Sequence, residues 1–346
     1  MIYLISLLYL VSGSLKDEIL STHTQCTEDH KHFQGETLAY LTPWNSLGYK
    51  YALKYPSKFT YVSPVWHELS FYYSAGETDF AITGDEDMNF LNSARGKIKI
   101  VPRLIITKTH PRAYISILNS DKQISRLAQA IIAFCQKNQY QGIVFEFWLQ
   151  GLGILNNLSN YAELRALQLR MLTMISKAMI KVGLVTILTL PPMRNNEITS
   201  SEFLTLVESF HRVNLMTYDF SPATPGPNAP MPWIKDTLSK LYSGNEVDNT
   251  KILLGVPFYG YDYKEGHGQP VIGKEFIDIL NKNVKDIWED SGKEHKFIYN
   301  NAGRDCVVYY PTLDMISERL AYAERHGMGI GIWELGQGLE YFFTLF

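Results

Sequence analysis

The sequence predicts an α/β protein of the (β/α)8 TIM-barrel class, with a small α+β insertion between the seventh and eighth strands. Strand-like apolar runs alternate with helical patterns, the runs number eight, and together they occupy about 310 residues, as in a barrel of this kind. A chain of 346 residues, 46% of them hydrophobic, is long enough to bury such a core.

The predicted strands are short runs rich in aliphatic, β-branched and aromatic residues. In chain order they are Thr37–Leu41, Phe59–Val65, Lys97–Leu104, Gly142–Trp148, Val185–Leu190, Val213–Thr217, Lys251–Pro257 and Gly329–Trp333. Between the strands, a period near 3.6 predicts helices that include Asp121–Asn138, Asn160–Val182 and Ser201–His211.

The segment between the last two strands, residues 258–328, is longer than one crossover helix needs. Two parts of it, Lys296–Asn300 and Cys306–Tyr310, have the composition of short strands. We therefore place the insertion at about residues 262–310 of a barrel domain that spans 35–346.

The first residues, MIYLISLLYLVSGS, form an apolar run that ends in small residues. The run is too short to span a bilayer and predicts a secretory signal over residues 1–14, with an uncleaved anchor as the alternative. We expect a secreted or lysosomal protein that does not span a membrane. Residues 15–34 show little hydrophobic periodicity and predict an extended arm. Asn157 begins the single acceptor sequon and is the expected glycosylation site.

The net charge and the spacing of cysteines and histidines bear on whether the protein binds nucleic acid or metal ions. A net charge of −3 gives no electrostatic argument for binding nucleic acid. Cys135 falls in an apolar helical pattern, while Cys26 and Cys306 are candidates for a pair, which the spacing leaves open. We expect no metal and no cofactor, because four histidines lack metal-ligand spacing and read as solvated residues: His23, His30, His32 and His67.

The fourth predicted strand, within QGIVFEFWLQ, carries the most informative pattern in the chain. Alternation would place Ile143, Phe145 and Phe147 on one face, and Val144, Glu146 and Trp148 on the other. A single carboxylate among apolar residues is unusual for a buried parallel strand. It suits a barrel strand that opens into a site at one end.

This stretch resembles the fourth-strand signature of glycoside hydrolase family 18, the chitinases, which reads D-G-x-D-x-D-x-E. Gly142 matches, Gln141 and Val144 replace the first two aspartates, Glu146 replaces the third, and Trp148 stands at the catalytic glutamate. An indole cannot protonate a leaving oxygen. Glu146 is about 6–7 Å further back along an extended strand. The resemblance therefore implies the fold and a saccharide groove without turnover.

Other strands carry further matches to this family. VNLMTYD resembles the sixth-strand motif that lines the cleft floor, which implies roles for Met216, Tyr218 and Asp219. GIGIWE resembles the eighth strand, whose terminal Trp stacks beneath the sugar, and implies that role for Trp333. Thr186–Pro191 and Leu254–Tyr261 resemble the fifth and seventh strands.

We predict a saccharide-binding set made of Trp333, Trp148, Glu146, Tyr218, Asp219, Met216, Trp66 and Trp44. Several members have a structural alternative. Trp333 would otherwise plug the barrel end, Trp148 would fill volume, and Glu146 would join a hydrogen-bond network with Tyr218 or Asp219. Trp233 either caps the groove or anchors its own loop.

The expected function is non-catalytic recognition of chitooligosaccharides or related N-acetylglucosamine-containing glycans, by aromatic stacking and a few polar contacts. Two other functions stay open. One is a divergent, weak glycosidase that uses Glu146 and Asp219. The other is a protein-interaction partner in the secretory or endolysosomal route, with a vestigial cleft.

Overall fold

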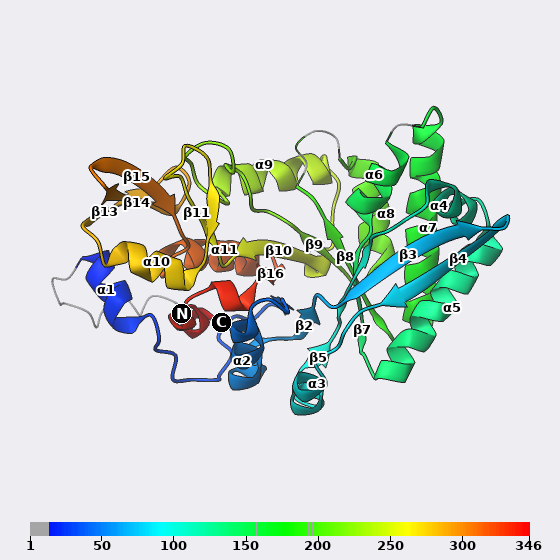
Figure 1. Ribbon diagram of the computed structural model, residues 1–346, viewed down its shortest axis with the longest axis horizontal. Coiled ribbons are helices and arrows are strands. Elements are labelled where there is room, and N and C mark those ends of the chain that lie inside the picture. Colours follow the sequence, from blue (N-terminus) through cyan, green and yellow to red (C-terminus); the bar gives the residue numbers. More distant parts are fainter. Residues whose placement is uncertain (1–13, 157, 193, 195–196) are drawn as a thin grey trace.

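A computed structural model describes residues 14–156, 158–192, 194 and 197–346 of the chain. The expected signal segment falls almost entirely in residues 1–13, and both these and the expected glycosylation site Asn157 lie outside the described part. Figure 1 shows a barrel-like sheet surrounded by helices, with a second, smaller sheet at one end of the molecule.

Eleven strands form the larger sheet, in the order β4-β3-β6-β7-β8-β9-β10-β16-β1-β2-β5. Every neighbouring pair is parallel except the hairpin β3–β4. The strands are β1 (Thr37–Leu41), β2 (Tyr61–Pro64), β3 (His67–Ser74), β4 (Glu77–Thr83), β5 (Lys99–Ile100), β6 (Arg103–Ile106), β7 (Gly142–Glu146), β8 (Val185–Leu190), β9 (Arg212–Leu215), β10 (Ile252–Pro257) and β16 (Gly329–Trp333).

The barrel wall is made of staves, each a single strand or two consecutive strands in line. It closes through two staves that each consist of two strands separated by a short gap. Strands β5 and β6 are consecutive parts of one stave, separated by Val101 and Pro102, and β2 and β3 are parts of the preceding one. The first parts pair with each other, β2 with β5, and the second parts pair likewise, β3 with β6. With these two pairs each counted once, and β4 set aside because it pairs only with β3, the larger sheet has eight staves, which confirms the predicted (β/α)8 barrel.

The hairpin β3–β4 was not predicted. It extends past the barrel wall, as Figure 1 shows, and turns at Ala75 and Gly76, whose φ angles are 51° and 85°. Two successive residues with positive φ are typical of a two-residue hairpin turn, and glycine adopts that conformation without steric cost.

The insertion is present between β10 and β16, as predicted. A five-stranded antiparallel sheet has the order β12-β11-β15-β14-β13, and helix α10 (Gly273–Leu280) lies between two of its strands in sequence. The strands are β11 (Gly260–Asp262), β12 (Gln269–Val271), β13 (Val284–Glu289), β14 (Glu294–Asn301) and β15 (Arg304–Tyr309).

Helices cover the outside of the barrel. They are α2 (Ser46–Lys54), α3 (Met88–Ala94), α4 (Pro111–Leu118), α5 (Asp121–Asn138), α6 (Trp148–Leu155), α7 (Tyr161–Lys181), α8 (Ser200–Ser209), α9 (Met231–Tyr242) and α11 (Leu313–Arg325). Side-chain caps set several of their starts, for example Ser120 at α5 and Thr199 at α8. Short 3-10 turns complete the chain at η1 (Pro56–Lys58), η2 (Asn249–Lys251), η3 (Leu335–Gln337) and η4 (Glu340–Leu345).

The predicted extended arm is wrong for its first part. Residues Leu15–Thr22 form helix α1, which Ser14 and Asp17 close with a reciprocal capping box. One apolar residue, Ile19, is completely buried, and Lys16 donates to the Lys282 carbonyl at 2.7 Å. The helix packs against the insertion, near α10 and β13. These contacts and the cap stabilise a helix that hydrophobic periodicity alone does not predict.

Candidate functional site

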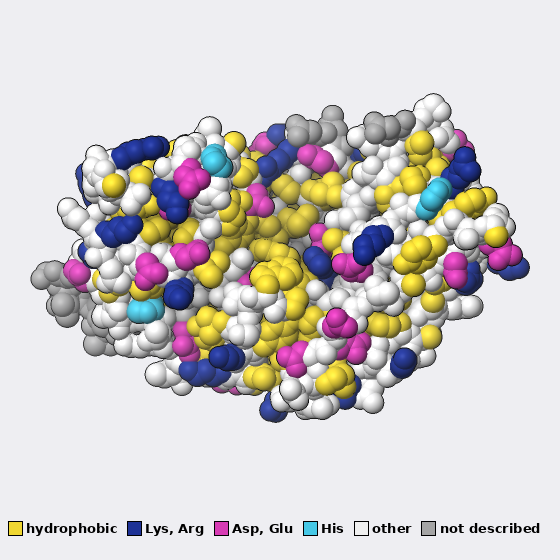
Figure 2. Space-filling view, in the orientation of Figure 1, with side chains coloured by type: hydrophobic (Ala, Val, Ile, Leu, Met, Phe, Trp, Pro, Cys, Tyr) yellow, Lys and Arg dark blue, Asp and Glu magenta, His cyan; other side chains and the backbone are white. Residues whose placement is uncertain are grey.

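A cleft of about 220 Å³ opens among the barrel strands, and its walls come from residues far apart in sequence. Figure 2 shows this face of the molecule hollowed near its centre, with hydrophobic side chains gathered around the hollow. The lining residues are Tyr40, Glu146, Thr189, Met216, Tyr218, Asp219, Tyr259 and Trp333. Five of the eight predicted residues therefore meet in one place: Glu146, Met216, Tyr218, Asp219 and Trp333.

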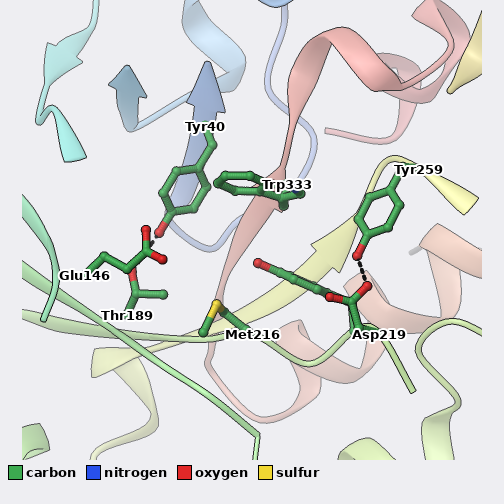
Figure 3. Close-up of a pocket in the computed structure, with 8 residues that line it drawn as sticks. Tyr40, Glu146, Thr189, Met216, Asp219, Tyr259 and Trp333 are labelled. Carbon is green, nitrogen blue, oxygen red and sulfur yellow. Dashed lines mark hydrogen bonds between the residues drawn. The ribbon is translucent and has the colours of Figure 1, made fainter. Parts of the chain in front are cut away.

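Trp333 closes β16 and forms one wall of the cleft together with Tyr40. The two ring centroids are 5.1 Å apart and the rings are inclined by 55°, an arrangement visible in Figure 3. The Tyr40 hydroxyl is fixed from below, because it bonds to Thr189 Oγ1 at 2.9 Å and accepts from Asn214 Nδ2 at 3.0 Å. Trp333 is half-buried, so its ring both packs on the barrel and faces the cleft.

Glu146 ends β7 and pairs with a residue of the neighbouring strand. Arg103 Nη1 donates to its carboxylate at 2.9 Å, and Gln150 Nε2 donates to the other oxygen at 3.1 Å. Burial raises the pKa of Glu146 above its ordinary value, while the Arg103 guanidinium opposes the rise. The expected network with Tyr218 or Asp219 is wrong; strand pairing of β6 with β7 supplies Arg103 instead.

Asp219 lies at the opposite end of the cleft, in the loop after β9. Its Oδ1 accepts hydrogen bonds from two tyrosine hydroxyls, Tyr259 and Tyr261, the latter at 2.6 Å. Figure 3 shows Asp219 and Tyr259 facing each other across this end of the cleft. Burial raises the pKa of both tyrosines far above the ordinary value, so both remain neutral hydrogen-bond donors.

The backbone at Asp219 is left-handed, with a φ of 62°. Such a conformation is uncommon for residues other than glycine, and surrounding contacts must hold it. Asn228 does so: its Oδ1 accepts from the Asp219 amide at 2.8 Å and its Nδ2 donates to the Tyr259 carbonyl at 3.1 Å. Asn228 is itself held in place, because its backbone N–H donates to the buried carboxylate of Glu294 at 2.9 Å.

Trp148 lies outside the cleft lining. Strand β7 ends at Glu146, two residues earlier than predicted, and Trp148 is the first residue of α6. Its ring is completely buried, and its Nε1 donates to the Glu197 carbonyl at 2.8 Å. A ring without exposed surface has no face for a sugar, so the structure places Trp148 as a volume-filling residue.

The remaining tryptophans also lie outside the lining. Trp66 is buried and donates to the Tyr49 hydroxyl at 2.8 Å. Trp44 is 70% exposed on the loop after β1. Trp233 packs on Phe220 at 5.2 Å, which anchors its loop. Three lining residues were not predicted, Tyr40, Thr189 and Tyr259; they lie in or next to predicted strands, where no motif marks them.

Histidines and cysteines form no cluster that could hold a metal ion in the part of the chain that the structure describes. The prediction of a solvated His67 is wrong, because it is buried beside Tyr140 and burial lowers its pKa to about 4. Cys26, Cys135 and Cys306 are buried free thiols, so the possible pair is not formed. Among the described helices, none has the length and apolar character needed to cross a membrane.

Two known proteins are similar to this chain in sequence. The uncharacterized glycosylase YvbX of Bacillus subtilis (strain 168) is 22% identical over 288 residues, which is 78% of this chain and 80% of that protein. Endochitinase 1 of Metarhizium robertsii is 27% identical over 150 residues, 35% of this chain and 34% of that protein.

Solved structures agree in fold. The chitinase of Chromobacterium violaceum superimposes with a TM-score of 0.74 at 19% identity, over 90% of this chain and 97% of its own. The spore cortex-lytic enzyme SleL of Bacillus cereus has a TM-score of 0.70 at 20% identity, over 90% and 73%. The sequence profile of the Glycosyl hydrolases family 18 matches residues 65–338. Since this match covers most of the barrel and the cleft, the chain belongs to glycosyl hydrolase family 18.

Proposed function

We propose that the protein binds saccharides in this cleft without cleaving them, and that its ligands are chitooligosaccharides or related N-acetylglucosamine-containing glycans. The observation that carries the proposal is the cleft itself, where the half-buried ring of Trp333 faces polar groups from Tyr218, Asp219 and Glu146. An aromatic face with a few convergent polar groups is the usual composition of a small-molecule site.

The absence of turnover is supported by what stands at the acid position. Trp148 is buried in α6 and carries no ionisable group. Glu146 is the carboxyl group nearest to that position in sequence, and Arg103 and Gln150 occupy its two oxygens. The Arg103 guanidinium favours the ionised form of this carboxylate, which opposes its use as a proton donor.

A closer relationship belongs to the same proposal. Residues 35–49, 225–233 and 332–342 resemble chitinase domain-containing protein 1, a secreted chitinase-like protein of animals whose fourth strand also lacks the acid. With the apolar N-terminal run, this resemblance supports a secreted or lysosomal location. The sequence similarity to YvbX, which is named a glycosylase, and to Endochitinase 1 also supports a saccharide ligand.

One observation favours the second candidate, a weak glycosidase. The pKa of Glu146 is raised by burial, and a raised pKa is typical of a carboxyl group that donates a proton. Release of a fluorescent leaving group from N-acetylglucosamine oligomers, lost in Glu146→Gln, would establish that activity.

Isothermal calorimetry with N-acetylglucosamine oligomers tests the main proposal. Trp333→Ala should weaken binding by roughly 1–3 kcal/mol, using aromatic stacking on nucleic-acid bases as the nearest scale. Trp288→Ala is the matched control, since Trp288 is a half-buried tryptophan of the insertion that does not line the cleft. Melting curves must show both variants folded, because Trp333 also packs on Tyr40.

Unchanged affinity in folded Trp333→Ala would place the saccharide elsewhere. No binding to any glycan on a broad array, combined with a specific protein recovered by pull-down, would favour the third candidate, a protein-interaction partner of the secretory or endolysosomal route.

A further inference from the structure

The lining of the cleft is unbalanced in charge. Of its eight residues, two carry carboxylates, Glu146 and Asp219, and none carries a cationic group. The other walls include the rings of Trp333 and Tyr40, which lie 5.1 Å apart. Aromatic faces and carboxylates both attract cations. The lining therefore has the composition of a site for a positively charged group.

The two carboxylates differ in how far they are neutralised. Glu146 is paired with Arg103 at 2.9 Å. Asp219 has no cation within ion-pair distance among the described residues, and both of its tyrosine hydrogen bonds end on Oδ1. In the same part of the chain, Oδ2 accepts no hydrogen bond and the Tyr218 hydroxyl has no partner. These two polar atoms remain available to a ligand.

A cationic side chain, Arg194, lies near Asp219, but its guanidinium contacts backbone carbonyls and an aromatic ring and not the carboxylate. The guanidinium of Arg194 donates to the backbone carbonyls of Tyr218 and Asp219 and lies 5.1 Å from the ring centroid of Trp233. Arg194 does not line the cleft. Its charge stabilises the loop and reduces the negative potential there, while the carboxylate itself stays unpaired.

We infer that, among the glycans proposed above, the cleft prefers those in which a hexosamine unit has lost its acyl group and carries a protonated amine that pairs with Asp219 Oδ2. This deepens the proposed function and rests on it. An ammonium offers a positive charge and three donors, whereas an N-acetyl amide offers one donor and no charge.

Calorimetry with two oligomers of equal length, one of glucosamine and one of N-acetylglucosamine, tests the inference. At low salt and mildly acidic pH, where the amine is protonated, the glucosamine oligomer should bind about three- to fivefold more tightly, the upper part of the range expected of one partly exposed ion pair. The ratio of the two affinities should shrink at high salt and at a pH where the amine is neutral.

Asp219→Asn should reduce that ratio to within about twofold, because it removes the charge and keeps the shape. Asp305→Asn, an exposed carboxylate on β15, has the same change in net charge and should leave the ratio as in the wild type. If Asp219→Asn does not fold, the salt and pH dependence of the wild-type ratio decides.

The outcomes separate the two proposals. Binding of neither oligomer would overturn the proposed saccharide function and this inference with it. Equal or tighter binding of the N-acetylated oligomer, or a preference that survives in folded Asp219→Asn, would overturn the amine assignment alone.

Discussion

Replacing Glu334 with Gln should make the stability of the protein less dependent on pH. Glu334 directly follows Trp333 and is completely buried. Its carboxylate accepts hydrogen bonds from Asn45 Nδ2 at 2.8 Å and from the Gly336 amide at 2.9 Å, but it has no cationic partner among the described residues. Burial raises its pKa to about 7, although these hydrogen bonds act in the opposite direction.

The sign of the effect follows from proton binding. Between pH 4.5, the ordinary pKa, and about pH 7, the folded protein keeps a proton that the unfolded chain has released. Stability due to this group is therefore present below the lower value and is lost as pH rises through the window. The window of 7 − 4.5 = 2.5 pH units corresponds to about 3 kcal/mol, at about 1.4 kcal/mol per unit.

Urea unfolding of wild type and Glu334→Gln at about pH 4 and about pH 8 measures this difference. A protonated Glu and a Gln are both uncharged, but the Gln Nε2 cannot accept one of the two N–H hydrogen bonds, so the variant should be somewhat less stable than wild type at the lower pH. At the higher pH the variant should gain up to about 3 kcal/mol relative to wild type. The control is Glu265→Gln, an exposed residue. A gain that is the same at both pH values would refute the reasoning.

Three other predictions, on two substitutions and on the N-terminus, have definite expected outcomes. Trp148→Glu should yield no chitinase in a fluorogenic assay and should lower unfolding stability by several kcal/mol, since it replaces a completely buried ring with a smaller, polar side chain; robust turnover would contradict this. Asn228→Ala should weaken saccharide binding through Asp219, so calorimetry should show a much smaller loss when Asp219→Asn is already present, whereas additive losses would indicate a purely structural role. N-terminal sequencing of protein recovered from medium or endolysosomal lumen should begin near residue 14, and an intact Met1 on a cytosolic protein would disprove the signal.

The barrel strands could be predicted because burial on both faces leaves a continuous apolar run in the sequence. The bounds of β1, β8 and β16 are as predicted, and α5 begins and ends at the expected residues. The hairpin β3–β4 could not be found in this way. Its exposed positions include large aromatic residues, Tyr72 and Tyr73, which hide the alternation of buried and exposed residues that marks a half-buried strand.

The residues of the cleft that belong to a short sequence motif could be predicted, and those that reach it only through tertiary contacts could not. Met216, Tyr218, Asp219 and Trp333 follow from two short motifs. The partner of Glu146 did not, because Arg103 lies 43 residues earlier and comes close only through the pairing of β6 with β7. The role of Asn228 could not be predicted either, since it depends on the left-handed backbone at Asp219.

Trp148 stands where the family has its acid, and its backbone conformation differs from the predicted one. A strand reaching Trp148 would have turned its side chain toward the same side as Glu146. Instead the chain bends at Phe147, whose backbone is already helical, and α6 begins.

Several contacts hold this bend. Gln168 Nε2 donates to the Trp148 carbonyl at 2.9 Å, and a Cβ added at Gly151 would come within 2.4 Å of both Gln168 and the Tyr114 hydroxyl. A glutamate at 148 would therefore replace a packed ring inside a helix junction. Restoring an acid to the cleft would require rebuilding that junction, which supports the proposal that the cleft binds saccharides and does not hydrolyse them.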